Sequence, residues 1–230
     1  VPGLSSDTTI KFSPQKNRFM IVISNGYFYK VYHHDLNTGE RLSLGQLYAS
    51  ISAVHNNSHQ KPRCSNPIGI LTASNRDVWA TNYKHLCDNP LNKISLEQIQ
   101  SASFVLCLDD NFPTTIAEKS VNCWYGNGYN RWFDKPVQLF VAKNASSGFL
   151  GEHSRMDGTP TLRMNDWIIK QISKMSVTEF HDEKKMAPRY TELVFEVDPF
   201  IQSQIQKEKK AFKQVTESLS INVWQFHGFG

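Results

Sequence analysis

A histidine with an acidic residue four positions later is the feature of this sequence best suited to chemistry. His153 precedes Asp157 and Gly158 in the block Gly-Glu-His-Ser-Arg-Met-Asp-Gly. Histidine takes up and returns a proton near neutral pH, as general acid–base catalysis requires. The pattern alone is also typical of a surface ion pair or a helix cap, so a catalytic base is one of several interpretations at this point.

The apolar residues before His153 predict how the chain positions it. Phe149 and Leu150 continue a strand that returns after a turn over 143–147, and a helical pattern follows over 161–175. A strand is a rigid element, so we expect it to hold His153 at its end, from where the ring can project into a cleft. Glu152 is the neighbouring residue, and its side chain is expected to point the other way.

Ordered blocks that flank His153 extend the pattern along almost the whole chain. They are Val1-Pro2-Gly3, Asn25-Gly26-Tyr27-Phe28-Tyr29, Leu71-Thr72 with Asn75-Arg76-Asp77-Val78-Trp79-Ala80, Asn130-Arg131-Trp132-Phe133-Asp134-Lys135 and Phe226-His227-Gly228-Phe229-Gly230. Together with E-H-S-R-M-D-G, these blocks resemble the choline/carnitine acyltransferase family. Within it, Glu152 to Thr161 looks most like the fungal carnitine O-acetyltransferases. His-x-x-x-Asp-Gly also resembles the signature of the wider coenzyme-A-dependent acyltransferases, which include chloramphenicol acetyltransferase.

The resemblance implies a reversible transfer of an acetyl or other short acyl group between coenzyme A and carnitine. His153 would be the general base that removes the proton from the attacking hydroxyl or thiol. That oxygen or sulfur would attack the acyl carbonyl directly, so no covalent acyl-enzyme is implied. Acetyl-CoA and carnitine would be the partners, with coenzyme A as a co-substrate and no permanently bound cofactor. The resemblance also implies a mitochondrial or peroxisomal location.

Asp157 and Gly158 are expected to support this site structurally. Asp157 either orients the His153 ring, as in a catalytic triad, or pairs with an arginine away from the ring. The resemblance favours the arginine pairing, and Arg131 and Arg155 are the candidates within this chain. Gly158 is expected to allow a tight turn between the strand and the following helix.

The length of the chain bears on what it does alone. The resemblance implies an enzyme more than twice as long as these 230 residues. We therefore expect residues 1–230 to form a single catalytic-histidine lobe of a longer two-domain enzyme, inactive by itself. The groups that bind carnitine and coenzyme A are expected beyond Gly230. Three alternatives stay open: a choline acetyltransferase of the same family, an acyltransferase of the lipoyl or condensation type, and a non-catalytic interaction module.

Composition narrows the class of protein further. The chain is 40% apolar and 12% aromatic, enough for a sizeable core, and its net charge of +4 suits an anionic partner but is too small to indicate nucleic acid. No apolar run approaches the roughly 18 residues that span a membrane. The four cysteines lack the spacing of a zinc site and indicate a reduced, intracellular protein. No acidic residue or cysteine lies at metal-ligand spacing from His33, His34, His55 or His59, so the sequence predicts no metal site there.

Alternating strand and helix patterns predict an α/β fold, with helices covering a mixed sheet as in the chloramphenicol acetyltransferase-like fold that the resemblance implies. Strands are expected over 19–23, 27–32, 104–108, 137–141, 148–152, 192–197 and 221–226. Helices are expected over 42–54, 114–123, 161–175 and 199–219, and from the caps Ser74 and Ser95, with a loop over 55–67. The last helix should turn Ile201, Ile205, Phe212, Val215 and Leu219 inward. Trp132 and Phe133 are expected in the core, and Asp134 and Lys135 as a local surface pair.

Overall fold

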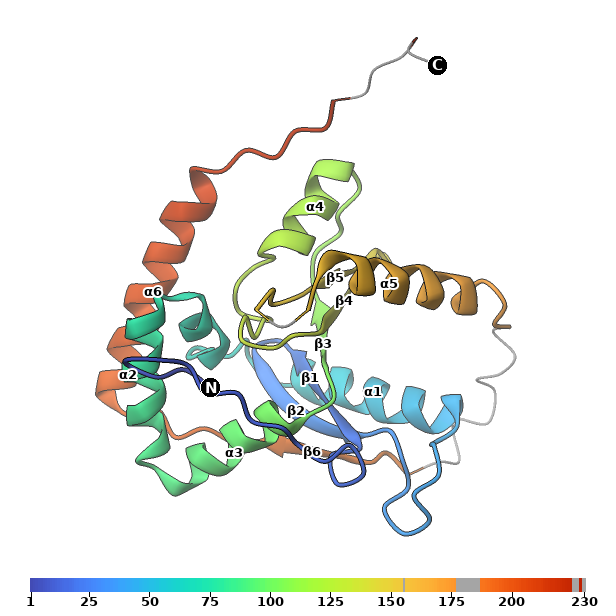
Figure 1. Ribbon diagram of the computed structural model, residues 1–230, viewed down its shortest axis with the longest axis horizontal. Coiled ribbons are helices and arrows are strands. Elements are labelled where there is room, and N and C mark those ends of the chain that lie inside the picture. Colours follow the sequence, from blue (N-terminus) through green and yellow to red (C-terminus); the bar gives the residue numbers. More distant parts are fainter. Residues whose placement is uncertain (155, 177–186, 225–227, 229–230) are drawn as a thin grey trace.

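The computed structural model describes residues 1–154, 156–176, 187–224 and 228. A six-stranded mixed sheet runs through its centre in the order β5-β4-β3-β1-β2-β6 (Figure 1). The strands are β1 (Phe19–Ser24), β2 (Tyr27–Tyr32), β3 (Val105–Asp109), β4 (Gln138–Ala142), β5 (Ser147–Leu150) and β6 (Tyr190–Leu193). β1, β3 and β4 are parallel, and the other neighbouring pairs are antiparallel. The predicted α/β class with a mixed sheet is confirmed.

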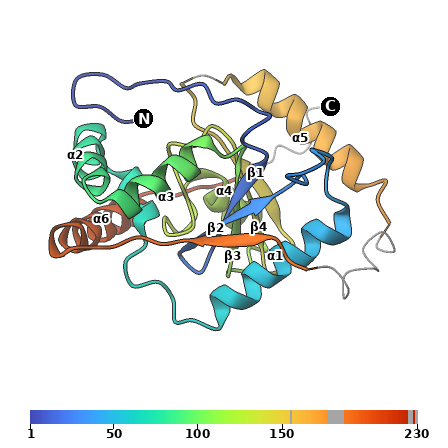
Figure 2. The ribbon, with the colours of Figure 1, turned by 90° about the horizontal axis from the view of Figure 1, so that it is seen from below.

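Helices cover both faces of the sheet. They are α1 (Leu44–His59), α2 (Arg76–Cys87), α3 (Pro90–Ser101), α4 (Ile116–Trp124), α5 (Gly158–Ile172) and α6 (Pro199–Glu217), with a 3-10 turn η1 (Ile68–Ala73) before α2. One core cluster packs residues of α2, α3 and α6 against the sheet, and a second packs Val54 of α1 against its other face. Figure 2 shows α1 and α3 on opposite sides of β2 and β6.

The β1–β2 hairpin forms because its turn suits the twist of the strands. Asn25 and Gly26 have φ angles of 54° and 82°, the left-handed values that a tight hairpin turn needs. A side chain on Gly26 would also come within 2.8 Å of the Cβ atom of Cys64. All six residues of β1 are buried. The hairpin predicted from Asn-Gly between two apolar runs is thus confirmed, and both of its strands are interior strands of the sheet.

Several predicted helix ends are wrong, and capping explains most of them. α1 continues to His59, so residues 55–59 are helical and not part of the expected loop. α2 is capped by Asn75, whose side chain accepts the Asp77 N–H, and not by Ser74. α3 starts earlier than the expected cap Ser95, because Asn89 caps it and Pro90 occupies its first position.

The end of the chain also differs from the prediction. The first turns of α6 bury Ile201 and Ile205 as expected, but Val215 and Leu219 are exposed because the later turns leave the body of the molecule. The expected strand over 221–226 is absent from its described part, residues 221–224, and residues 225–226 lie outside the described residues. No helix in the described ranges is long and apolar enough to cross a membrane.

Candidate functional site

His153 lies in the loop between β5 and α5. β5 ends at Leu150, two residues before the predicted strand end at Glu152, and α5 begins at Gly158. The histidine therefore lies just after the strand, three residues beyond its end. Its side chain is 81% exposed. β5 itself is held by antiparallel pairing with β4, in which Gln138 faces Leu150. The loop is therefore anchored at one edge of the sheet while the His153 side chain remains open to solvent.

Two glycines let β5 and the loop approach their neighbours closely. A Cβ atom on Gly148 would come within 2.4 Å of the Phe140 ring. A Cβ atom on Gly151 would meet the Phe149 ring at 2.6 Å and the Pro136 carbonyl oxygen at 3.1 Å. Any side chain at these positions would push the loop outward. Gly148 and Gly151 thus set the path of the chain into His153.

Gly158 differs from the expectation. It is the first residue of α5, its φ angle is not left-handed, and a Cβ atom there would have no neighbour within 4 Å. The strand-to-helix connection therefore does not require a glycine at this position. The prediction that Gly158 makes a tight turn possible is wrong for this chain.

Asp157 caps α5 and faces His153. Its Oδ1 accepts the Gly158 N–H at 2.7 Å, and the same oxygen lies 3.7 Å from His153 Nε2. That separation fits an ion pair but is too long for a hydrogen bond. Both side chains are exposed, Asp157 at 83%. Among the described residues the nearest basic group to this carboxylate is therefore the histidine ring.

The predicted pairing of Arg131 with Asp157 is wrong, because Arg131 is bound elsewhere. Its two terminal nitrogens donate to both oxygens of Asp109 at 2.9 and 2.8 Å, and the pair is buried at the end of β3. Burial alone would lower the pKa of the Arg131 guanidinium, but the Asp109 carboxylate outweighs it and raises that pKa. The ring of Phe140 lies 5.0 Å from the guanidinium carbon. The other candidate, Arg155, lies outside the described residues.

Asp134 and Lys135 do not form the expected surface pair. Asp134 accepts hydrogen bonds from Arg76 and, at 2.6 Å, from the Trp79 indole nitrogen. Lys135 is buried, and its Nζ donates to three backbone carbonyls at the end of α3. Burial lowers the pKa of Lys135 to about 8. The predicted packing of Trp132 is confirmed, since it is buried in the main core, and Phe133 contacts Phe212.

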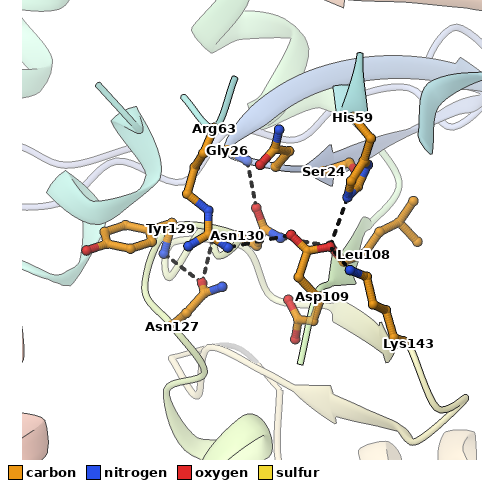
Figure 3. A network of polar contacts seen from close by, with 12 residues as sticks. Ser24, Gly26, His59, Arg63, Leu108, Asp109, Asn127, Tyr129, Asn130 and Lys143 are labelled. Atoms are coloured by element: carbon orange, nitrogen blue, oxygen red, sulfur yellow. Dashed lines mark hydrogen bonds and ion pairs between the residues drawn. The ribbon is translucent and has the colours of Figure 1, made fainter. Parts of the chain in front are cut away.

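A polar network at the carboxyl ends of β1 and β3 holds the loop before this segment (Figure 3). Asn130 accepts the Gly26 N–H and donates to the Leu108 carbonyl. Beside it, His59 lies 2.9 Å from Asp110, which also meets Lys143 and Arg63 at 3.4 and 3.5 Å. The pairing of His59 with Asp110 could not be predicted from the sequence, because 51 positions separate the two residues.

Metal-ligating side chains do not gather in the described part of the chain. No group of three or more His, Cys, Asp or Glu residues is placed there to hold an ion. All four cysteines are free thiols, and Cys107 is fully buried, which raises its pKa to about 12.

His153 thus lies in an exposed loop just beyond the edge strand β5 of a mixed α/β sheet, four residues before Asp157 and Gly158. The chain matches the Choline/Carnitine o-acyltransferase family over residues 1–230. It therefore belongs to that family.

Curated relatives show which members it is similar to. It is 38% identical to the mitochondrial carnitine O-acetyltransferase of Saccharomyces cerevisiae over 237 residues, which cover 100% of this chain and 35% of that enzyme. It is 31% identical to human carnitine O-acetyltransferase over 244 residues, or 100% of this chain and 38% of the relative. Human mitochondrial carnitine O-palmitoyltransferase 2 is 31% identical over 95% of the chain and 33% of its own length. The chain thus spans little more than a third of the length of the relatives it matches.

Proposed function

We propose that the full protein containing this sequence transfers an acetyl group reversibly between coenzyme A and carnitine, with His153 as the general base. The observation that supports this most strongly is the position of His153. In a chain that matches the family from end to end, it is the exposed histidine of the Glu-His-Ser-Arg-Met-Asp-Gly block, just beyond β5. The yeast and human relatives are carnitine O-acetyltransferases by name, which favours a short acyl group as the group transferred and carnitine as its acceptor.

The proposed reaction needs one proton carrier and no covalent intermediate. The His153 ring takes the proton from the carnitine hydroxyl as the oxygen attacks the thioester carbonyl of acetyl-CoA. When the carbon–sulfur bond breaks, the imidazolium returns that proton to the departing thiolate. The reverse reaction starts with the coenzyme A thiol. A positioned base of this kind typically contributes a factor of about 10² to 10⁴ to the rate.

Asp157 fits a supporting role in this proposal. It caps α5 and lies 3.7 Å from the ring nitrogen of His153, so it fixes the start of the helix next to the base. We therefore assign Asp157 to positioning, and we assign no role to Gly158.

We propose further that residues 1–230 are one lobe of a two-domain enzyme and are inactive alone. The relatives are almost three times as long as the segment that this chain matches. The groups that hold carnitine and the coenzyme A phosphates would lie in the remainder of the enzyme. Positioning two substrates can lower a barrier by roughly 7 to 11 kcal/mol, so a base without these groups gives little turnover. Coenzyme A acts as a co-substrate, and the yeast relative supports a mitochondrial location.

A thiol-release assay tests this function. The full protein should release free coenzyme A from acetyl-CoA when carnitine is added, and the 230-residue chain alone should not. Choline is the alternative acceptor, because the family includes choline acyltransferases. Release with choline but not with carnitine would establish the alternative, and release with neither would contradict the proposed function.

A further inference from the structure

The segment from Arg131 to Lys135 is fixed at every residue to a different part of the fold. Its contacts are Arg131 with Asp109 of β3, Trp132 N–H with Gln138 of β4, Phe133 N–H with Thr72 of η1, Asp134 with Arg76 and Trp79 of α2, and Lys135 with the end of α3. A loop tied to two strands and three helical elements is held in one position. None of these contacts involves the proposed base directly.

Lys135 makes the last and most unusual of these contacts. Its side chain is buried, with 6% of the residue exposed. Nζ donates to the carbonyl oxygens of Ile99, Gln100 and Ala102 at 3.0, 2.9 and 2.5 Å. An ammonium group has three donors, so this geometry uses all of them. The last carbonyls of a helix lack intrahelical partners and form its negative end, which a cation stabilises.

The same segment lies under the loop that carries His153. The Pro136 carbonyl oxygen directly underlies Gly151, where a Cβ atom would approach it to 3.1 Å. Lys135 and Pro136 also share the wall of one cavity of about 580 Å³ with Glu152 and Ser154, the two neighbours of His153. A displacement of the segment would therefore move the base of the His153 loop.

We propose that Lys135 is a positioning residue for His153. Its ammonium group ties residues 131–136 to the end of α3, and this segment sets the position and direction of the His153 loop. The inference rests on the proposed function, which supplies the reaction that His153 serves. Lys135 is not a catalytic residue, since its three donors are bound to backbone and it has none left for a substrate.

The test replaces Lys135 with methionine in the full protein. Lys135→Met keeps the length and apolar stem of the side chain but removes the charge and the donors. We expect kcat for acetyl transfer to fall about tenfold while KM for both substrates stays within about threefold, because the base is displaced and the binding groups are not. The ring signals of His153 in a ¹H–¹⁵N NMR spectrum should shift as well. Lys135→Arg keeps a cation, but its planar fork cannot reach the three carbonyls in the same way, so kcat should fall by less, about threefold.

Two controls separate positioning from stability. Lys84→Met on the exposed face of α2 should leave kcat and the ring signals unchanged. Ile205→Ala, in the buried α6 contact, should lower the melting temperature without changing kcat well below it. An unchanged kcat in Lys135→Met, or an equal loss of kcat in Ile205→Ala, would overturn the proposal. If Lys135→Met does not fold, Lys135→Arg decides, and wild-type kcat in that variant overturns it. If the wild-type protein has no acyltransferase activity, the proposed function fails, and the NMR shift alone tests the positioning.

Discussion

α5 and α6 are both amphipathic by sequence, yet the fold treats them differently. α6 buries Ile201 and Ile205 against α2 and η1 and contributes to the main core. α5 has no buried residue, and large apolar side chains remain open on it, among them Trp167, Ile169 and Ile172. Figure 1 shows α5 starting beside β5 and running to the rim of the molecule. A buried side thus carries the stability of the lobe, and an open side carries its candidate chemistry.

Substitutions on the buried side and on the open side should therefore have different effects. On the buried side, side chains have lost their water and depend on specific partners. On the open side, His153 and Asp157 are still solvated, so their replacement should affect turnover more than stability. Exposed apolar residues such as Ile169 make this the side on which the remainder of the proposed two-domain enzyme would pack.

The largest expected loss of stability comes from breaking the buried ion pair. Arg131→Met leaves the Asp109 carboxylate buried without its partner, and breaking such a pair costs about 3–5 kcal/mol. Chemical denaturation of the 230-residue chain followed by near-UV circular dichroism measures the loss. Arg63→Met is the matched control, because Arg63 is largely exposed and 3.5 Å from Asp110, and it should cost under about 1 kcal/mol. Equal losses in the two variants would show that the buried Arg131–Asp109 pair stabilises the fold no more than the more exposed Arg63–Asp110 pair.

The next comparison uses the same substitution on the two helices. Ile205→Ala removes a fully buried side chain and should lower the free energy of unfolding by about 2–5 kcal/mol. Ile169→Ala removes a side chain that is 67% exposed and should change it by less than about 0.5 kcal/mol in the chain alone. In the full protein the Ile169 variant should become more costly. A loss above about 1 kcal/mol for Ile169→Ala in the isolated chain would mean that α5 is already packed there.

The smallest expected losses of stability come from removing the two aspartate caps, Asp198 and Asp157. Asp198 accepts the Ile201 N–H of α6 at 2.8 Å and lies 2.6 Å from His85. Within the described part of the chain, the backbone donor that the Asp157 carboxylate accepts is only the adjacent Gly158 N–H. Asp198→Ala should therefore cost about 1 kcal/mol and Asp157→Ala about half of that or less. Thermal unfolding of both variants at neutral pH provides the measurement. Equal losses would show that the two caps are equivalent.

The Asp198 cap also predicts a pH dependence. The Ile201 N–H and then His85 lower the pKa of the Asp198 carboxyl below its ordinary value. A carboxyl with a lowered pKa in the folded state stabilises the protein fully above the unfolded value of about 3.9 and loses that effect as the pH falls through the folded value. The stability difference between wild type and Asp198→Ala should thus shrink below about pH 4. A difference that stays constant down to pH 2 would contradict the assignment.

The sequence predicted the features that depend on local residues. Asn25 and Gly26 fix the hairpin because few residues accept left-handed φ angles. The apolar run ending at Leu150 placed His153 beyond a strand, and the ordered motifs indicated the family that the whole chain matches.

Features that depend on distant partners could not be predicted. Arg131, in the loop before β4, meets Asp109 at the end of β3, 22 positions away, and nothing in either neighbourhood marks the pair. From the sequence, Lys135 is expected to be a surface residue. Its partners are backbone carbonyls, which any sequence would supply and no residue pattern marks. The exposure of α5 was equally hidden, since an amphipathic pattern does not say which surface will cover it.

Replacing His153 in the full protein tests whether this residue is the general base. His153→Ala should lower kcat for acetyl transfer from acetyl-CoA to carnitine by at least about 10², the lower end for a lost general base. Because the side chain is 81% exposed, the melting temperature should stay close to that of the wild type, and acetyl-CoA affinity should stay within about threefold. Near-normal turnover in a folded His153→Ala protein would contradict the account.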